Sequence, residues 1–335
     1  MLKAAYLNQG REPGIARVYD ATTQAAIASM FDLDATVYTK EDMLCDRLSE
    51  VEAIFSTWGF PVMTDAEIST HLPKLKIVFY GAGSVQAFAR PLLRCGVTVV
   101  SAWMANSVPV IEYTVAQIIL ANKGYFGASR LCSRDAAFRR EAAAHFAAFR
   151  GNYDTPVGLI GLGAIGAGVA RRLRDYRLQV YAYDPYCSAE KAADLGVTLA
   201  DLDFIFETCL TVSNHTPNIP STRGMLSYTH FSRMPQNGVF INTGRGAQVV
   251  EEDLIRALRE EPARTAVLDV THPEPPVEGH PFYELDNVIL TPHIAGSAGA
   301  ECYRMGAYMA EEAARYLNGE PLRYAVSEKM LETMA

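Results

Sequence analysis

The stretch Val157-Gly158-Leu159-Ile160-Gly161-Leu162-Gly163-Ala164-Ile165-Gly166 decides the fold of this chain. Its first four residues form an apolar run typical of a buried β-strand, and they lead directly into the spacing G-x-G-x-x-G. A helix-like run with apolar residues at Val169 and Leu173 follows. A glycine cluster often only closes a tight turn, but between a strand and a helix this spacing lets the backbone approach a pyrophosphate closely. The context therefore predicts a dinucleotide-binding unit.

An acidic residue follows at the position where such a unit binds the adenosine ribose. Asp184 comes 18 residues after Gly166, at the end of the next expected strand, Leu178–Tyr183. A carboxylate there accepts hydrogen bonds from the ribose hydroxyls and repels a 2′-phosphate. Pro185 and Tyr186 supply no arginine that could bind such a phosphate. The sequence therefore predicts NAD rather than NADP, held by Gly161, Gly163, Ala164, Ile165, Gly166 and Asp184.

Short β-rich runs alternate with helix-length segments along most of the chain, which predicts parallel sheets covered by helices on both faces. The first set of expected strands is Lys3–Leu7, Ala35–Thr39, Ala53–Thr57, Lys76–Tyr80 and Thr98–Ala102. A long helical pattern, Ser107–Tyr125, connects it to a second set. That second set has six strands, the number that the dinucleotide-binding fold uses: Val157–Ile160, Leu178–Tyr183, Leu210–Asn214, Gly238–Asn242, Ala266–Val270 and Val288–Leu290.

The composition excludes several classes of function. A net charge of −8 without a block of Lys or Arg argues against nucleic-acid binding. The N-terminus has no apolar leader, and polar residues interrupt the apolar stretch Val97–Ala121, so we expect no membrane segment. The six cysteines are scattered and no two histidines have ligand spacing. We therefore expect reduced thiols, a cytoplasmic protein and no metal site.

Three polar side chains follow strand ends of the second set: Arg245, Glu274 and His293. Ligands of doubly wound sheets bind beyond the carboxyl ends of the strands, so these residues are expected at the cofactor. Reduction of a 2-oxo acid needs a group that binds the carboxylate, a proton donor, and a group that keeps the donor protonated. An arginine, a histidine and a glutamate meet these three needs.

Each of these residues also has a simpler interpretation. The arginine could be a turn residue that pairs with Glu251 or Glu252, the histidine a core residue, and the glutamate a solvated loop acid. His272 and His280 are alternatives to His293, although neither directly follows a strand. The joint placement of the three beside a dinucleotide motif favours the catalytic interpretation.

At these motifs the chain resembles the D-2-hydroxyacid dehydrogenases. The resemblance covers about Lys74 to Leu317 and rests on motifs in the family's order: GLGAIG (161–166), YDP (183–185), NTGRG (242–246), LDVTHPEPP (268–276) and TPHIAG (291–296). It implies an NAD-dependent oxidoreductase acting on a small D-2-hydroxy or 2-oxo acid, and a homodimer. It also implies an α/β fold of two doubly wound parallel-sheet domains. These are a Rossmann NAD-binding domain, residues 103–297, and a flavodoxin-like substrate domain, residues 1–102 completed by 298–335.

The resemblance also assigns roles to single residues. Arg245 would bind the substrate carboxylate and carbonyl, His293 would be the acid/base, and Glu274 would orient and polarise His293. Thr243 and Asp269, the latter inside the end of its strand, would join His293 in contacting the cofactor. Backbone N–H groups of the loop around Ala82 and Gly83 would bind the substrate. The position of Trp58 after a first-set strand also places it among the expected substrate contacts, and simple packing is an equally good interpretation of this residue.

The sequence departs from the family after that glycine loop, where Ser84-Val85-Gln86 replaces the usual Asp-Asn, and at Cys209-Leu210, where an acidic residue is usual. The first departure leaves the substrate open. The loops that follow the first-set strands near Trp58, Ala82 and Trp103 contain no Lys or Arg, which favours an unphosphorylated acid.

Two related proteins remain as alternatives. An NAD-sensing interaction protein resembling the C-terminal-binding-protein corepressors would share all of these motifs. A formate dehydrogenase of the same fold would need Gln in place of Glu274, so the glutamate argues against it.

Overall fold

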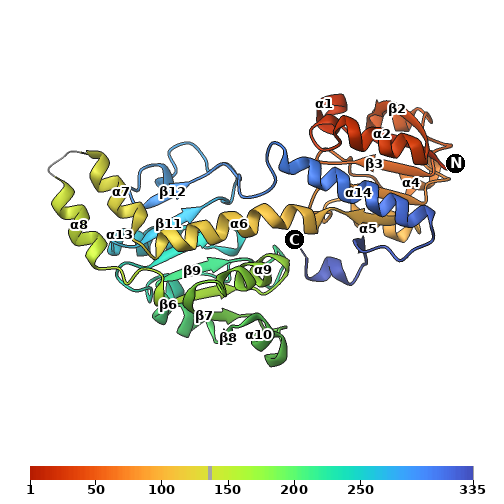
Figure 1. The fold of residues 1–335 in the computed structure, drawn as a ribbon. Helices are drawn as coiled ribbons and strands as arrows, with labels where there is room; N and C mark the ends of the chain where they lie inside the picture. The colour runs from red at the N-terminus through yellow and green to blue at the C-terminus, as the bar shows by residue number, and fades with distance from the viewer. Residues whose placement is uncertain (135–137, 335) are drawn as a thin grey trace. The chain divides into compact units, whose positions relative to one another are not determined.

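The computed structural model describes residues 1–134 and 138–334, and the chain forms two compact units. Unit 1 comprises Met1–Ser107 and Ser297–Ala335, and unit 2 comprises Val108–Gly296 (Figure 1). The first break falls within a long helix, α6 (Trp103–Ala121), a few residues beyond the boundary expected from the sequence. Unit 2 contains the glycine-rich stretch, and unit 1 contains both ends of the chain.

Unit 1 is built on a six-stranded sheet with the order β13-β5-β4-β3-β1-β2. Every pairing is parallel except that of the short C-terminal strand β13 with β5. The order 2-1-3-4-5 of the first five strands is that of the flavodoxin-like fold, as predicted. The strands are β1 (Lys3–Leu7), β2 (Asp32–Tyr38), β3 (Ala53–Ser56), β4 (Ile77–Tyr80), β5 (Thr98–Ser101) and β13 (Ala325–Val326).

The strands of unit 1 are buried on both faces because their side chains alternate between two apolar clusters. Leu7 and Ile54 belong to one cluster, and Tyr6 and Phe55 to the other. The C-terminal helix α14 (Glu301–Leu317) covers the second face beside α2 (Ala21–Met30), as Figure 1 shows. The remaining helices of this unit are α1 (Arg11–Ala16), α3 (Lys40–Leu44), α4 (Asp65–His71) and α5 (Ala89–Arg94).

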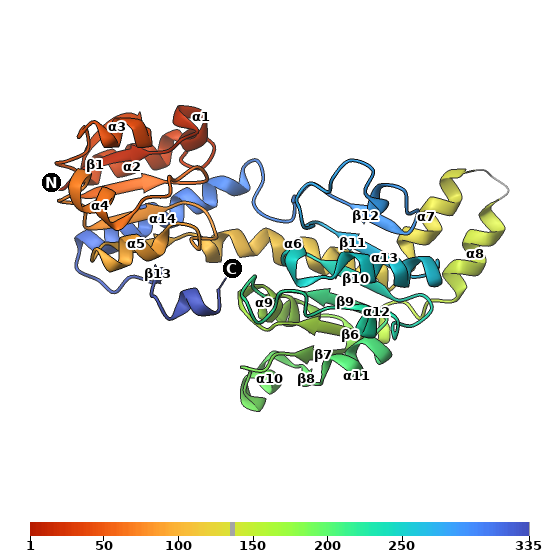
Figure 2. The same ribbon diagram turned by 180° about the vertical axis from the view of Figure 1, so that it is seen from behind.

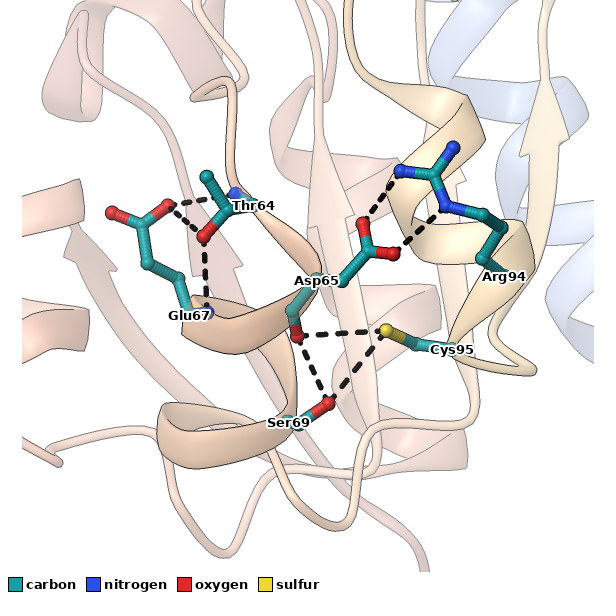
Figure 3. Close-up of polar contacts among 6 residues, drawn as sticks. All are labelled: Thr64, Asp65, Glu67, Ser69, Arg94 and Cys95. Atoms are coloured by element: carbon teal, nitrogen blue, oxygen red, sulfur yellow. Dashed lines mark hydrogen bonds and ion pairs between the residues drawn. The ribbon is translucent and has the colours of Figure 1, made fainter.

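Local polar contacts fix the start of α4 (Figure 3). The Thr64 Oγ1 atom accepts from the Glu67 N–H at 3.2 Å, and the Glu67 carboxylate accepts from the Thr64 N–H at 2.8 Å, which forms a capping box. The Asp65 carboxylate accepts two hydrogen bonds from the Arg94 guanidinium, and the Cys95 Sγ atom lies 3.7 Å from the Asp65 carbonyl oxygen. These contacts join α4 to α5, although an ion pair this exposed contributes little to stability.

Unit 2 contains a fully parallel sheet with the order β12-β11-β10-β9-β6-β7-β8. This is the doubly wound Rossmann order, so the predicted fold class is confirmed. Figure 2 shows these strands side by side. The strands are β6 (Tyr153–Ile160), β7 (Arg177–Tyr183), β8 (Thr198–Leu199), β9 (Thr211–Asn214), β10 (Val239–Asn242), β11 (Thr265–Leu268) and β12 (Val288–Leu290).

Two details differ from the sequence prediction. The two-residue edge strand β8 was not expected, so the sheet has seven strands rather than six. The strand β11 ends at Leu268, so Asp269 lies just beyond the strand instead of inside it. The apolar Val270 prolonged the β-like pattern past the point where strand pairing stops. Asp269 therefore lies in a loop, where its carboxylate can accept hydrogen bonds from neighbouring residues.

Helix α6 has the length and apolar character that a membrane span requires. Its mean hydropathy is 1.2, and it is the one such helix among the described residues. Its buried residues Ile118 and Ala121 pack in the core of unit 2 with Val157 and Leu159 of β6. Core packing therefore accounts for part of the apolar side chains of this helix. The other helices of unit 2 are α7 (Tyr125–Arg134), α8 (Arg139–Ala147), α9 (Ala164–Leu173), α10 (Ala189–Leu195), α11 (Leu202–Thr208), α12 (Tyr228–Phe231) and α13 (Glu251–Glu260).

Candidate active site

The glycine-rich turn joins β6 to α9, and two of its three glycines have separate steric reasons. Gly161 has a φ of +89°, which favours glycine. A Cβ atom at Gly166 would overlap the carbonyl oxygen of Gly161, so this glycine allows the helix to pack closely on the turn. A Cβ atom at Gly163 would meet no protein atom within 4 Å. The turn therefore leaves its backbone accessible beside the N-terminus of α9, where N–H groups can bind phosphate.

Asp184 follows β7 and is bound directly to the glycine-rich turn. Its Oδ2 atom accepts from the Leu162 N–H at 2.7 Å, and its Oδ1 atom accepts from the Tyr186 N–H at 2.8 Å. The ammonium group of Lys191, on α10, donates to the Leu162 carbonyl oxygen at 3.0 Å. The carboxylate thus has a fixed position and keeps lone pairs for ribose hydroxyls. Lys191 is a cation near this position that the sequence analysis did not consider.

His215, in the loop after β9, is a further residue that the sequence analysis missed. Its backbone packs against Gly161, and its ring lies beside Gly166. The Nδ1 atom lies 3.4 Å from the Oγ1 atom of Thr243, and the buried Nε2 atom has no hydrogen-bond partner in the described structure. Burial lowers the pKa of His215 to about 3, so the ring is neutral. A buried nitrogen needs a partner, and a dinucleotide bound at this turn can supply one, so the site fits the cofactor.

Asp269 accepts hydrogen bonds from the loop that carries His293. Its Oδ1 atom accepts from the Thr291 hydroxyl at 2.6 Å and from the Ile294 N–H at 2.8 Å. Its Oδ2 atom accepts from the Ala295 N–H at 2.9 Å. His293 itself has a φ of +56°, a conformation that costs energy for a residue with a side chain. The contacts of Asp269 therefore hold this loop in a shape that it would not adopt alone.

Glu274 and His293 form a close pair. The Nδ1 atom of His293 lies 2.6 Å from the Oε1 atom of Glu274, and both side chains are about two-fifths exposed, 44% and 39%. A carboxylate at Nδ1 orients the ring and leaves Nε2 as the nitrogen that can exchange a proton with a ligand. The pair therefore has the geometry of a general acid/base with its orienting carboxylate.

Arg245, in the turn after β10, completes the constellation within unit 2. Its Nη1 atom donates to the Gly244 carbonyl oxygen at 2.7 Å. Burial lowers the pKa of the Arg245 guanidinium, and the negative charge of Glu274 opposes that shift. Arginine remains charged even so. A mostly buried cation beside a carboxylate–imidazole pair is well suited to binding a small carboxylic acid.

Glu251, at the start of α13, holds the loop that carries Glu274. Its Oε1 atom accepts from the His272 N–H at 2.7 Å, and its Oε2 atom lies 3.5 Å from the Nε2 atom of His280. Burial raises the pKa of Glu251. Glu251 therefore pairs with His272 and His280, and not with Arg245 as the simpler interpretation proposed. Both alternative histidines, His272 and His280, contact Glu251 rather than Glu274.

The glycine loop of unit 1 follows β4. Both Ala82 and Gly83 are fixed by Ser101, whose hydroxyl donates to the two carbonyl oxygens at 2.9 and 2.6 Å. The Ala82 N–H already donates to the Tyr80 carbonyl oxygen at 2.9 Å. Gln86, the departure from the family pattern, donates to two carbonyl oxygens of the C-terminal segment, at Leu331 and Met334. In this chain Gln86 therefore binds the C-terminal segment of unit 1 to the segment that follows β4.

A cation lies beside Trp58 in unit 1. Trp58, two residues beyond β3, is 37% exposed, and the guanidinium carbon of Arg17 lies 4.9 Å from its ring centroid. Arg17 follows α1 and is distant from Trp58 in the sequence. The loops after the first-set strands near Trp58, Ala82 and Trp103 contain no Lys or Arg of their own. The fold nevertheless brings the cation of Arg17 to Trp58.

Comparisons with known proteins identify the family of this chain. Residues 123–295, more than half of the chain, match the family model of the D-isomer specific 2-hydroxyacid dehydrogenase, NAD binding domain. The D-3-phosphoglycerate dehydrogenase of Archaeoglobus fulgidus is 31% identical over 269 residues, which are 80% of this chain and 50% of that protein. The glyoxylate reductase of Korarchaeum cryptofilum is 29% identical over 284 residues, 83% of each protein. The chain thus spans about half the length of the phosphoglycerate dehydrogenases that it matches.

Solved structures show the same fold. The apo form of Rhodotorula graminis D-mandelate dehydrogenase superimposes with a TM-score of 0.82 at 21% identity, covering 98% of each chain. The NAD-complexed D-isomer specific 2-hydroxyacid dehydrogenase of Lactobacillus delbrueckii gives a TM-score of 0.76 at 20% identity, covering 97% of this chain and all of that one. The family match includes the glycine-rich turn and the three clustered residues of unit 2, and its cofactor is NAD. The chain belongs to the D-isomer specific 2-hydroxyacid dehydrogenase family.

Proposed function

We propose that this protein is an NAD-dependent D-2-hydroxyacid dehydrogenase, which transfers a hydride between NAD(H) and a small D-2-hydroxy or 2-oxo acid. The observation that supports this most strongly is the 2.6 Å contact between His293 and Glu274, in the same unit as Arg245 and the glycine-rich turn. An arginine, an imidazole and a carboxylate are the three groups that reduction of a 2-oxo acid requires.

In the proposed reaction NADH supplies the hydride to the carbonyl carbon of the 2-oxo acid. Arg245 binds the substrate carboxylate and polarises the carbonyl group. His293 donates a proton from Nε2 to the carbonyl oxygen, so that the products are the 2-hydroxy acid and NAD⁺. Glu274 stabilises the imidazolium before the transfer and keeps the ring in position. Oxidation of the hydroxy acid uses the same groups in reverse, with His293 as the base.

The remaining predicted contacts belong to this proposal. The cofactor would be bound by Gly161, Gly163, Ala164, Ile165, Gly166, Asp184, Thr243, Asp269 and His293. The substrate would be bound by Trp58, Ala82, Gly83 and Arg245. Because the Ala82 N–H is already engaged, we assign the amide contact in that loop chiefly to Gly83.

The identity of the acid stays open within this class. Relatives of this chain carry the names D-3-phosphoglycerate dehydrogenase and glyoxylate reductase, so both phosphorylated and very small acids are candidates. Arg17 beside Trp58 adds a cation that could bind an anionic group at the far end of the substrate. We further propose a cytoplasmic homodimer that binds neither nucleic acid nor a membrane, as expected from the charge and the family.

The test is NADH oxidation with a panel of 2-oxo acids: glyoxylate, pyruvate, hydroxypyruvate, 3-phosphohydroxypyruvate, 2-oxoglutarate and phenylglyoxylate. We expect turnover with at least one of them, and loss of that turnover in a His293→Asn variant that still binds NADH. Tight NADH binding without turnover of any acid would contradict the proposal and favour an NAD-sensing interaction protein.

A further inference from the structure

The main chain of Arg245 is held at both of its polar groups by buried side-chain amides. The Arg245 N–H donates to the Oε1 atom of Gln248 at 2.7 Å. The Arg245 carbonyl oxygen accepts from the Nδ2 atom of Asn242 at 3.1 Å. Both amides are almost completely buried, with exposed fractions of 0% and 1%. The backbone of the proposed substrate-binding arginine is therefore fixed from both sides by neutral groups.

A third amide joins these two into a closed network. Asn214, at the end of β9, is paired in register with Asn242 of β10. Its Nδ2 atom donates to Asn242 Oδ1 and to Gln248 Oε1, both at 3.1 Å, and its Oδ1 atom accepts from the Thr216 hydroxyl at 2.8 Å. Gln248 Nε2 in turn donates to the Thr216 carbonyl oxygen at 3.0 Å. Every amide atom of the network that can bond does so.

The three amide side chains of the network can adopt few other orientations. A buried amide that loses a partner incurs a desolvation penalty, so each side chain is confined to the orientation in which all of its hydrogen bonds form. Asn242 Oδ1 also accepts from the Gly244 N–H at 3.1 Å, and the Gly244 carbonyl oxygen accepts from the Arg245 guanidinium. The amides thus fix the peptide that binds the guanidinium as well as the residue that carries it.

We propose that Gln248 and Asn214 are positioning residues for substrate binding, which act by fixing the direction of the Arg245 guanidinium. This inference rests on the proposed function, in which Arg245 binds the substrate carboxylate. A purely structural role would require the same amides only for folding. The two roles differ in whether a variant changes substrate affinity through Arg245 once the fold and the cofactor site are intact.

The first experiment compares the wild type with Gln248→Met, which keeps the chain length of the side chain and removes its polar atoms. We expect the KM of the best 2-oxo acid to rise at least about tenfold, with the Kd of NADH unchanged. Asn287→Leu is the matched control. Asn287 is a buried amide of unit 2 that donates to the carbonyl oxygens of Leu258 and Arg264, before β12 and away from the carboxyl ends of the strands. Asn287→Leu should lower thermal stability without raising KM.

The second experiment repeats Gln248→Met in an Arg245→Met background, with KM and the Kd of oxamate for the NADH complex as readouts. If Gln248 acts through Arg245, the second substitution adds little to the first. An unchanged KM in Gln248→Met, or an equal further loss in the Arg245→Met background, would overturn the inference while the wild-type turnover still supports the dehydrogenase. Absence of both turnover and oxamate binding in the wild type would instead refute the proposed function, and with it this inference.

Discussion

The Nδ1 atom of His293 lies 2.6 Å from the Oε1 atom of Glu274, and separate carboxylates bind the loops that carry the two residues. Asp269 binds the loop of His293 through three hydrogen bonds. Glu251 binds the loop of Glu274 through the His272 N–H. Two further acids, the buried Asp269 and the partly buried Glu251, thus support the short contact between two partly exposed side chains.

The carboxylate of Glu274 should support the rate of reduction. It lies 2.6 Å from the Nδ1 atom of His293, so it orients the ring for proton transfer from Nε2. Glu274→Gln keeps the shape of the side chain and removes its charge, so the ring should be oriented less firmly. We therefore expect a fall in kcat of about tenfold or more, measured at saturating NADH.

The Kd of NADH serves as the control for this variant, and it should change little. His293→Asn should lower kcat by about a hundredfold or more, because general acid catalysis contributes this much. An unchanged kcat in Glu274→Gln would show that the pair is not coupled in catalysis. Near-normal turnover in His293→Asn would exclude His293 as the acid.

Glu251 should act on the rate through the loop of Glu274. In Glu251→Ala the His272 N–H loses its acceptor, so the Glu274 carboxylate should no longer stay at 2.6 Å from the imidazole. We expect a fall in kcat of about tenfold, in the same direction as in Glu274→Gln. Glu252→Ala, at the exposed neighbouring position, is the matched control and should behave like the wild type. Equal kinetics for the two variants would refute this role.

Strands and motifs, which depend on consecutive residues, were predicted from the sequence. Contacts between residues far apart in the sequence were not. Apolar runs identified six strands of unit 2, but the two exposed residues of β8 carry no such pattern. The motif residues Arg245, Glu274 and His293 were predicted because each directly follows a strand end or lies in its loop. The residues that hold these loops in place were not predicted. Asn214 and Gln248 become partners only once β9 and β10 lie side by side, which no spacing in the sequence reveals.

The same limit explains the two overlooked cations. Lys191 lies on α10 and Arg17 follows α1, each outside the loops in which a ligand-binding residue was sought. Helix packing brings Lys191 to Leu162 and Arg17 to Trp58. A loop that contains no charged residue can therefore still lie beside a cation from a neighbouring helix.

Arg17 should affect substrates according to the charge at their far end. Arg17→Met removes the cation beside Trp58 and keeps an apolar side chain. If Arg17 binds a distal anion, kcat/KM should fall about tenfold more for 3-phosphohydroxypyruvate or 2-oxoglutarate than for pyruvate. Lys40→Met, at another cation of unit 1, serves as a control for net charge. An equal fall for all acids would mean that Arg17 only supports the Trp58 ring.

Asp184 should make the protein prefer NADH. Its carboxylate accepts from the Leu162 N–H of the glycine-rich turn, and in the proposed cofactor site it would bind the ribose hydroxyls and repel a 2′-phosphate. We expect a higher kcat/KM with NADH than with NADPH, and a smaller difference in Asp184→Asn, which keeps one acceptor for the Leu162 N–H. Lys191→Met tests the nearby cation and should reduce any residual use of NADPH. Equal turnover of both cofactors by the wild type would refute the ribose assignment.

His215 should make the stability of the protein depend on pH in the absence of cofactor. Burial lowers its pKa to about 3, whereas a histidine in the unfolded chain has a pKa of about 6.5. Below pH 6.5 the unfolded state therefore takes up a proton that the native state does not, and the native state loses stability as the pH falls from there towards 3. Between pH 7.5 and 5.5 this single group should lower the free energy of unfolding by about 1.4 kcal/mol.

Urea unfolding at the two pH values should show a correspondingly smaller loss in His215→Asn than in the wild type, and the ring resonance of His215 should not titrate above pH 5. An identical pH dependence in both proteins, or a ring that titrates near pH 6.5, would mean that the ring reaches solvent and is not the buried neutral partner of the glycine-rich turn.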